Sequence, residues 1–177
     1  MNNIVPYNAS LQKLASSFDC GNSYLNNFLN SADSLNNSVS KTYVFLTEDE
    51  AAIIGYYSIT TGCITSSEEQ ASWRIGGSIH ISELAVDKRY HRWHMALEND
   101  DSQISFSDIL LTDCIDRILR LHEFLGFAFI TLNSTAQGRS LYKRSGFEEI
   151  EEDMSIPSDK SERECTPMYL LLELLDY

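Results

Sequence analysis

Phe127-Ala128-Phe129-Ile130-Thr131-Leu132 is the stretch that indicates the fold, because it holds one hydroxyl among five aromatic and aliphatic side chains. A run of this kind without polar alternation is typical of a strand buried on both faces of a sheet. Gly126 before it and Asn133 after it favour turns, so they bound the strand. The sequence therefore predicts a central buried strand over residues 127–132.

The segment before this strand has the periodicity of an amphipathic helix. Over Ser105–Leu125, apolar residues recur at helical spacing on one side and charged residues on the other. Ser105 and Asp108 have the spacing of a capping box, and Gly126 is the glycine expected just beyond the last turn. The preceding residues, about 91–104, match neither a helix nor a strand, so we expect a loop or an insertion there.

Further helices and strands are predicted on both sides of these elements. Their types follow from helical spacing, from runs of β-branched and aromatic residues, and from the turn residues between them. The predicted helices are Leu11–Ala32, broken at Asp19–Asn22, and Gln137–Arg144; the predicted strands are Thr42–Leu46, Ala52–Thr61, Ser78–Val86, Glu148–Asp153 and Met168–Leu175. This order predicts an α+β (mixed α/β) fold with a mostly antiparallel central sheet.

Length and composition limit the classes of protein to which the chain can belong. With 177 residues, of which 43% are hydrophobic and 22% charged, we expect one domain over residues 1–177. The net charge of −13 argues against a general nucleic-acid binder, because phosphate selects basic surfaces. The sequence has neither a signal-peptide pattern nor an apolar run that could span a bilayer. We therefore expect a cytoplasmic protein with no membrane partner.

Three patterns occur in order along the chain: Phe18-Asp19-Cys20-Gly21, Glu83–Tyr90 (ELAVDKRY) and Leu141–Phe147 (LYKRSGF). Together they resemble the GNAT acetyltransferases, in particular the branch that includes toxins paired with ribbon-helix-helix antitoxins. The resemblance implies a GNAT-like fold with flanking helices, in which two central strands, Ile79–Val86 and Phe127–Leu132, run parallel and splay apart at their C-terminal ends. It also implies that acetyl-CoA lies in the gap between those ends.

The resemblance implies which residues hold acetyl-CoA. The pantetheine arm would pair with the backbone of Ala85 and Val86, and Asn133 would hydrogen-bond the arm or the substrate. The diphosphate would lie on the N-terminus of the following helix, where family members have a loop of the form Arg/Gln-Gly-x-Gly-x-Gly/Ala. This chain has no glycine there in either of two registers, His91–Ala96 or Ser102–Ser107. We favour the second register, which gives the diphosphate the first residues of the helix: Ser105, Phe106, Ser107 and Asp108.

Two side chains are predicted to carry out the chemistry that the resemblance implies. Tyr142 matches the family's tyrosine near the thioester sulfur, which can protonate the leaving thiolate as a general acid. Glu83 is an acidic residue in an otherwise apolar strand. It is the predicted base that deprotonates the substrate amine, with His80 or a water molecule as the alternatives.

No metal site is predicted. His91 and His94 have the spacing H-x-x-H, and Asp100 and Asp101 are near in sequence, but no motif fixes a third ligand. We interpret the two histidines as loop residues in solvent. The four cysteines form no C-x-x-C pair, so neither a zinc site nor a redox pair is indicated.

With the resemblance, these residues predict an acetyl-CoA-dependent N-acetyltransferase that acts on an amine of a small molecule, a peptide or an aminoacyl-tRNA. The net charge makes tRNA the less favoured acceptor, and its candidate contacts are five basic residues: Lys88, Arg89, Arg92, Lys143 and Arg144. The predicted protein partner is an antitoxin-like protein or a second copy of the chain. The alternative function is a non-catalytic binding protein with this fold, whose glycine-free loop no longer binds a diphosphate.

Overall fold

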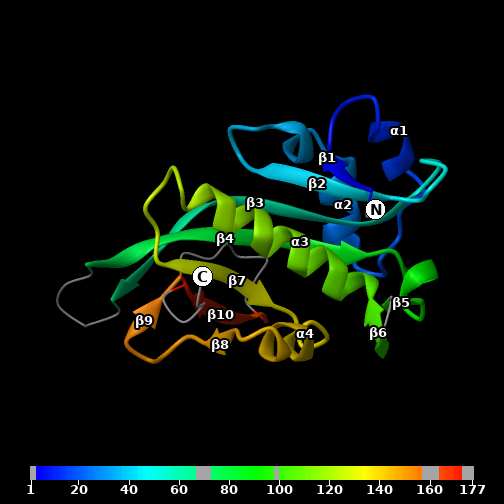
Figure 1. Cartoon of the computed structure of the whole chain (residues 1–177). Coiled ribbons are helices and arrows are strands. Elements are labelled where there is room, and N and C mark those ends of the chain that lie inside the picture. Colours follow the sequence, from blue (N-terminus) through cyan, green and yellow to red (C-terminus); the bar gives the residue numbers. More distant parts are fainter. Residues whose placement is uncertain (1–2, 67–72, 98–99, 157–163, 173–177) are drawn as a thin grey trace. The chain divides into compact units, whose positions relative to one another are not determined.

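The elements follow one another in the predicted order, with short strands added between them (Figure 1). The structure is a computed structural model and describes residues 3–66, 73–97, 100–156 and 164–172. The strands are β1 (Ile4–Pro6), β2 (Lys41–Leu46), β3 (Ile53–Ser66), β4 (Arg74–Val86), β5 (His94–Leu97), β6 (Asp100–Ser105), β7 (Phe129–Ser134), β8 (Glu148–Glu149), β9 (Met154–Ser155) and β10 (Thr166–Leu171). The helices are α1 (Gln12–Ala15), α2 (Ser23–Asn30), α3 (Phe106–Leu121) and α4 (Arg139–Arg144), and the 3-10 turns are η1 (Asp33–Leu35) and η2 (Lys88–Tyr90).

The large sheet is mixed, with one parallel pair of strands. Its order is β1-β2-β3-β4-β7-β10-β8, and β9 pairs with β3. β4 and β7 run parallel, whereas β1–β2, β2–β3, β3–β9, β7–β10 and β8–β10 are antiparallel. This arrangement confirms the predicted α+β class and the mostly antiparallel sheet.

The parallel pairing of β4 with β7 stops before either strand ends. The register runs from Ser78 opposite Phe129 to Ile81 opposite Leu132. β4 then continues to Val86 and β7 to Ser134 without further parallel pairs. Two parallel strands whose pairing ends early are what the predicted splay requires.

By compactness the chain divides into two units: residues 1–59 with 83–117, and residues 60–82 with 118–177. The first unit has a core between its N-terminal helices and its strands, and Tyr56 on β3 is central to it. The Tyr56 ring lies 5.5 Å from the Phe18 ring and 6.1 Å from the Phe28 ring, and its hydroxyl donates to the carbonyl of Leu25 (2.8 Å). The Asn22 side chain caps α2 by accepting two backbone N–H groups. The buried members of this core are Tyr7, Ala15, Phe18, Leu29, Val44, Leu46, Ile53, Tyr56 and Ala85.

The second unit is built around β7 and β10, which pair over six residues. A buried cluster of Ile64, Phe129 and Ile156 lies in this unit. Helix α4 ends at Arg144, and Gly146 follows its C-cap Ser145 with a φ of +88°, the left-handed conformation of a C′ glycine. The chain then turns back, and the Phe147 ring packs edge-on against Tyr142 at 5.8 Å. This packing buries both aromatic residues of the third sequence pattern.

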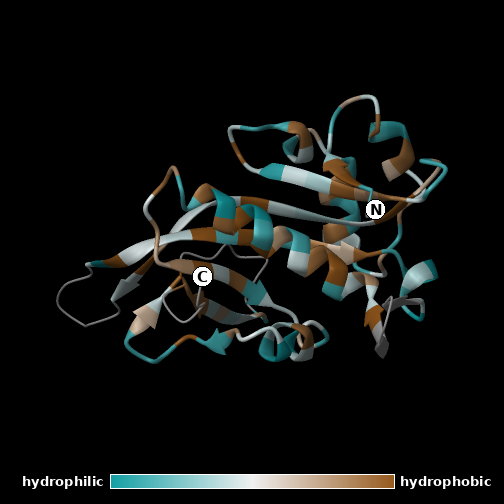
Figure 2. Ribbon diagram, viewed as in Figure 1, coloured by the Kyte–Doolittle hydropathy of each residue, from teal (hydrophilic) through white to brown (hydrophobic). Residues whose placement is uncertain are grey.

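Helix α3 shows the amphipathic character that its sequence predicts (Figure 2). Its buried side chains are Ile109, Leu110, Leu111, Cys114 and Ile118. Asp113 lies at the edge of this face, where it accepts hydrogen bonds from the Tyr57 hydroxyl (2.6 Å) and from Arg117 (2.8 Å). Arg117 also lies 4.4 Å from the centre of the Tyr43 ring. The polar edge of α3 therefore also contacts β2 and β3, through Tyr43 and Tyr57.

The structure corrects the predicted end of this helix and the predicted loop before it. Helix α3 ends at Leu121, not Leu125, and Gly126 does not have the positive φ of a C′ glycine. The His122 ring hydrogen-bonds the carbonyl of Phe127 (3.0 Å), which holds residues 122–125 in a turn. Residues 94–97 and 100–105 are not a loop, because they form the antiparallel strands β5 and β6. The single domain with an insertion at about 91–104 stays a prediction.

Strand boundaries also differ from the predicted ones. β3 is longer than Ala52–Thr61, and β4 begins at Arg74, so the end of the expected polar connection is strand. Residues 67–72 of that connection lie outside the described residues. In the part of the chain that the structure describes, no helix is both long and apolar enough to cross a membrane.

Close contact at Gly55 yields a test of the packing between β3, β4 and α3. A Cβ atom at Gly55 would lie 2.5 Å from Leu110 Cδ1 and 2.7 Å from the carbonyl oxygen of Ala85. We predict that Gly55→Ala lowers the free energy of unfolding by about 2 kcal/mol through overpacking. Gly126→Ala is the control, because a Cβ there meets no atom within 4 Å. Urea denaturation measures both, and equal stabilities of the two variants would contradict this packing.

Candidate active site

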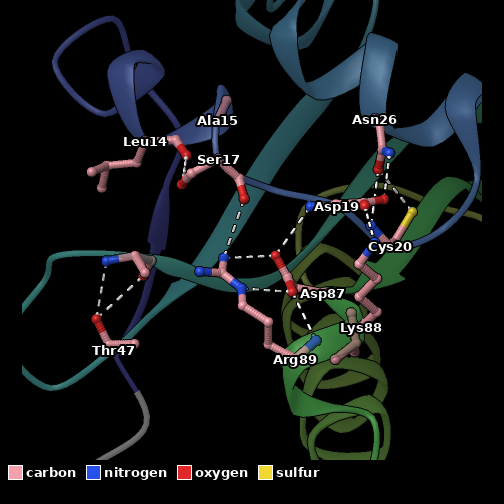
Figure 3. A network of polar contacts seen from close by, with 12 residues as sticks. Leu14, Ala15, Ser17, Asp19, Cys20, Asn26, Thr47, Asp87, Lys88 and Arg89 are labelled. Carbon is pink, nitrogen blue, oxygen red and sulfur yellow. Dashed lines mark hydrogen bonds and ion pairs between the residues drawn. The ribbon is translucent and has the colours of Figure 1, made fainter.

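A buried carboxylate, Asp87, organises the C-terminal end of β4 (Figure 3). Its Oδ1 accepts hydrogen bonds from the backbone N–H of Arg89 (2.9 Å) and from Arg89 Nε (2.9 Å). Its Oδ2 accepts from Arg89 Nη2 (2.7 Å) and from the backbone N–H of Asp19 (3.0 Å). Burial alone would raise the pKa of Asp87, but these hydrogen bonds outweigh burial and lower it. Asp87 therefore stays ionised and fixes the turn that follows β4.

Asp87 also joins the first two sequence patterns. Lys88 donates from its backbone to the Asp19 carbonyl (2.9 Å), and its ammonium pairs with the Asp19 carboxylate. The hydrogen bond from Lys88, with further ones from Gly21 N–H and Asn26, lowers the pKa of Asp19 to about 2. Asn26 Oδ1 in turn accepts the backbone N–H of Cys20 (3.0 Å). The turn before α2 and the end of β4 are thus one polar network, which the two patterns encode together.

These ion pairs also occupy most of the basic residues that could contact RNA phosphates. Lys88 pairs with Asp19, and Arg89 pairs with Asp87. In the second unit, Lys143 pairs with Glu149 at 2.7 Å. The side chains of these three residues remain about half exposed, but each cation already has a carboxylate beside it. The sequence prediction that they supply a cationic patch is therefore weakened by their partners.

The backbone of Ala85 and Val86 has a defined orientation. The Asp87 N–H donates to the Ile54 carbonyl (2.8 Å), and the Ala85 carbonyl lies against Gly55, so both groups point toward β3. Because successive residues of a strand alternate, the Val86 carbonyl points toward the opposite edge of β4. There the His91 Nε2 hydrogen-bonds it at 2.8 Å. The sequence analysis missed this contact, because nothing in the local pattern relates the histidine to a strand carbonyl.

The start of α3 carries the predicted capping box. Ser105 Oγ accepts the backbone N–H of Asp108 (3.2 Å), and the Asp108 carboxylate accepts from both the N–H and the hydroxyl of Ser105. Ser105 and Ser107 hydroxyls are 2.8 Å apart. The helix begins at Phe106, which agrees with the second of the two loop registers. A carboxylate thus stands at the helix N-terminus, where the resemblance places a diphosphate.

Phe106 anchors this helix start. Its ring packs edge-on against Phe45 at 5.5 Å and against Tyr90 at 6.0 Å. Tyr90 belongs to η2, so the turn fixed by Asp87 also contacts the start of α3 through an aromatic pair. The Phe106 ring is therefore an anchor of the helix start, and the contact predicted for Phe106 with the diphosphate is through its backbone N–H.

Glu83, the predicted base, is a buried residue with 6% of its surface exposed. It lies near the Tyr56 phenol, whose pKa is raised well above its usual value, first by burial and then by the charge of Glu83. A carboxylate in an apolar strand is thus held against the core of the first unit. Its role as a base stays a prediction.

Asn133 and Tyr142 belong to the second unit. Asn133 lies on β7 just beyond the last parallel pair, and its side-chain nitrogen is buried with no hydrogen-bond partner among the described residues. Tyr142 lies on α4 with 8% of its surface exposed. Its ring is close to Gly138, where a Cβ would be 3.1 Å from Tyr142 Cε2. Gly138 therefore gives the Tyr142 ring the room that it occupies.

The described residues contain no group of three or more histidine, cysteine or acidic side chains placed to hold a metal ion. The side chains of His94, Asp100 and Asp101 lie outside that description. All four cysteines are thiols. Cys114 is fully buried, and burial raises the pKa of its thiol well above the usual value.

Comparison with known proteins rests on structure alone, since no family model and no curated protein matches the sequence. A solved structure described as a bacterial toxin superposes with a TM-score of 0.70 at 16% identity, over 98% of this chain and 93% of that chain. A tyrosine-to-phenylalanine mutant of the AtaT toxin, bound to the C-terminus of the antitoxin AtaR and to acetyl-CoA, gives 0.65 at 16% identity, over 97% and 93%. AtaT complexed with acetyl-methionyl-tRNAfMet gives 0.66 at 17% identity, over 91% and 96%. The chain therefore shares the fold of these solved toxin structures, which confirms the predicted GNAT-like fold.

Replacing Asp87 tests its role at the end of β4. We predict that Asp87→Asn lowers the free energy of unfolding by about 2 kcal/mol at pH 7, because the buried donors of Arg89 and Asp19 lose their charged acceptor. The folded pKa of Asp87 lies below the unfolded value, so this stabilisation is complete above about pH 4 and is lost as the pH falls through the folded pKa. Urea titrations at several pH values measure it.

Asp19→Asn is the control, because Asp19 is exposed and its loss should cost less than that of Asp87. A difference between wild type and Asp87→Asn that stays constant down to pH 2 would contradict the assignment of an ionised Asp87.

Proposed function

We propose that this protein is an acetyl-CoA-dependent N-acetyltransferase of the toxin branch. The observation that carries the proposal is the parallel pair β4–β7, whose pairing ends at Ile81 and Leu132 inside a fold shared with acetyl-CoA-bound AtaT over nearly the whole chain. The cosubstrate is acetyl-CoA, which supplies an activated acetyl group as a thioester. We further propose that the protein works in the cytoplasm.

The residues that would hold acetyl-CoA fit its pantetheine arm better than its diphosphate. The Val86 carbonyl already accepts a hydrogen bond at the edge of β4 that faces away from β3, so a pantetheine amide N–H can replace His91 there. The buried amide of Asn133 can donate to a second polar group of the arm. At the diphosphate position a 16-residue helix begins at Phe106, which favours an anion. The backbone N–H groups of Ser105 and Asp108 are already bonded within the capping box, however, and the Asp108 carboxylate opposes a negative charge.

Tyr142 is the proposed general acid. A buried phenol on α4 can give its proton to the thiolate that leaves when the thioester breaks. Its AtaT counterpart is not identified by residue, but the AtaT structure that holds acetyl-CoA and antitoxin carries a tyrosine-to-phenylalanine change. For the base, the sequence predicts Glu83, with His80 or water as alternatives.

The acceptor that we propose is the α-amino group of an aminoacyl-tRNA. Its support is the AtaT complex with acetyl-methionyl-tRNAfMet. The net charge of −13 and the ion-paired Lys88, Arg89 and Lys143 oppose broad phosphate contact, so recognition would centre on the aminoacyl end. A small amine or a peptide remains the alternative acceptor. An antitoxin-like protein is the proposed partner, as AtaR is for AtaT, and a homodimer is the alternative.

A second candidate function is a non-catalytic binding protein with this fold. It is favoured by the capping box, because Asp108 places a negative charge where the diphosphate would lie and no glycine brings the backbone close to it. Binding of CoA distinguishes the two functions.

Substitution of Tyr142 tests the proposed acid. We predict that Tyr142→Phe lowers acetyl transfer from radiolabelled acetyl-CoA to methionyl-tRNA by about 10²-fold while leaving CoA affinity unchanged. Expression of the wild-type protein in bacteria without a partner should arrest growth, and Tyr142→Phe should relieve the arrest. Tyr169→Phe is the control, since its hydroxyl contacts only the surface residue Glu148 among the contacts described. Equal rates for wild type and Tyr142→Phe would remove Tyr142 from the mechanism.

Removal of the charge at the helix start separates the two functions. We predict that Asp108→Asn tightens CoA binding about fivefold, because one negative charge near the diphosphate is lost. Asp116→Asn on the exposed side of α3 is the control and should leave the affinity unchanged. Equilibrium dialysis with labelled CoA measures both. Failure of the wild type and of Asp108→Asn to retain CoA would favour the non-catalytic protein.

A further inference from the structure

A chain of buried hydrogen bonds links β4 and β7 within the second unit. Thr131 on β7 has no exposed surface, and its hydroxyl donates to Ser78 Oγ at 3.2 Å. The same Thr131 oxygen lies 3.0 Å from Nδ1 of His80, which faces it across the parallel register. Ser78 is 3% exposed, so two buried hydroxyls hold one partly buried imidazole.

The direction of these hydrogen bonds sets the tautomer of His80. Because the Thr131 proton is given to Ser78, the Thr131 oxygen accepts the hydrogen bond from His80 and Nδ1 carries the ring proton. In the neutral ring Nε2 then has the lone pair. A histidine held by its Nδ1–H with Nε2 as the acceptor is the arrangement that a general base requires.

Gly62 on β3 makes room for these three side chains. A Cβ at Gly62 would lie 2.9 Å from Ser78 Oγ, 3.4 Å from His80 Cβ and 4.0 Å from Thr131 Oγ1. A larger residue would displace Ser78 first and break the chain at its end. The orientation of His80 is thus determined by groups on three strands, of which Ser78 and Thr131 are buried.

Two further polar atoms lie one position beyond the end of the parallel pairing. The last pair is Ile81 with Leu132, so Ser82 and Asn133 are next on their strands. Ser82 Oγ and Asn133 Nδ2 are both buried and have no hydrogen-bond partner among the described residues. Buried polar atoms in folded proteins are nearly always satisfied, so two neighbouring exceptions point to a ligand. Both atoms can donate, which suits a carbonyl oxygen.

We propose that His80 is the base that deprotonates the acceptor amine, with Thr131 and Ser78 as its positioning residues, and that Ser82 and Asn133 bind a carbonyl oxygen beside it. This proposal rests on the proposed acetyltransferase function. The carbonyl belongs either to a pantetheine amide or to the aminoacyl group of the acceptor. Among the alternatives that the sequence left open, it selects His80 over Glu83, because Glu83 is three positions further along β4 and so faces the other side of the sheet from His80 and Thr131.

The proton transfers balance in this scheme. His80 Nε2 takes a proton from the substrate ammonium, and the freed lone pair forms the nitrogen–carbon bond to the acetyl group. The carbon–sulfur bond breaks, and the thiolate takes the Tyr142 proton. The phenolate regains a proton from the new amide nitrogen, and His80 releases its proton to water. One proton is released for each acetyl group transferred.

Activity measurements on the full chain test the base. We expect His80→Gln to lower kcat/KM for methionyl-tRNA about 10²-fold, with partial rescue of His80→Ala by added imidazole. Thr131→Val should lower kcat about tenfold with KM unchanged, and Thr131→Ser should restore it because the hydroxyl is kept. Thr42→Val is the matched control, since Thr42 is also buried and hydrogen-bonds a serine, Ser58, at 3.1 Å. Full activity of both His80→Gln and Thr131→Val in an active protein would overturn the proposal.

A measurement without substrate separates this proposal from the function on which it rests. Nitrogen NMR of the imidazoles, with His80 assigned from the His80→Gln spectrum, should show that neutral His80 has a protonated Nδ1 and an unprotonated Nε2. Thr131→Val should change the ratio of the two neutral tautomers of His80. A protonated Nε2 in the neutral ring would overturn the proposal even if the protein proves to be an acetyltransferase. An inactive wild type that still shows the predicted tautomer would overturn the function, and with it the role of base.

The carbonyl site has its own test. Ser82→Ala should weaken CoA binding if the carbonyl is a pantetheine amide, and should raise only the KM for methionyl-tRNA if it is the aminoacyl group. An unchanged CoA affinity together with an unchanged KM would overturn the assignment of Ser82.

Discussion

The buried carboxylate of Asp87 is the constraint on which the candidate site depends. Removing a charge from water is unfavourable unless strong hydrogen bonds replace the lost solvation, and Arg89 and the Asp19 N–H supply them. Because these donors come from η2 and from the turn before α2, the carboxylate can be satisfied only when both segments are in place. Tyr90, carried by the same turn, then packs on Phe106 at the start of α3. One ionised group thus fixes the strand end and the helix start that the proposed cosubstrate would contact.

Acidic side chains weaken the attraction of this protein for phosphate groups in two ways. Asp19, Asp87 and Glu149 neutralise three of the five basic residues that were candidates to contact phosphate: Lys88, Arg89 and Lys143. Asp108 instead caps α3 and so competes with an anion at the same helix end. If the protein acetylates an aminoacyl-tRNA, its specificity must come from the aminoacyl group more than from the RNA backbone. The hydrogen-bonded residues Ser78, Thr131 and His80, with the atoms of Ser82 and Asn133 that have no hydrogen-bond partner among the described residues, are polar groups that can bind an aminoacyl group.

Sequence patterns predicted the framework of this fold because they depend on local chemistry. The apolar run around Ile130, the amphipathic α3 and its Ser105–Asp108 box follow from periodicity and capping, and the structure has all three. The predicted end of α3 was wrong because it depends on the hydrogen bond between His122 and the Phe127 carbonyl, which the helical periodicity does not show. The β5–β6 hairpin was missed because its residues lack the alternation of a half-buried strand. The hydrogen bond between His80 and Thr131 joins residues 51 positions apart, so no local pattern could have shown it.

The central claim is that the protein binds acetyl-CoA despite its glycine-free loop. Calorimetric titration of the wild-type chain with acetyl-CoA tests it most directly, because the measurement requires neither an acceptor nor turnover. We predict a saturable heat with one site per chain and a dissociation constant in the micromolar range, a binding free energy of about −8 kcal/mol. No heat of binding at concentrations up to about 1 mM, where the free energy would be near −4 kcal/mol, would contradict the account.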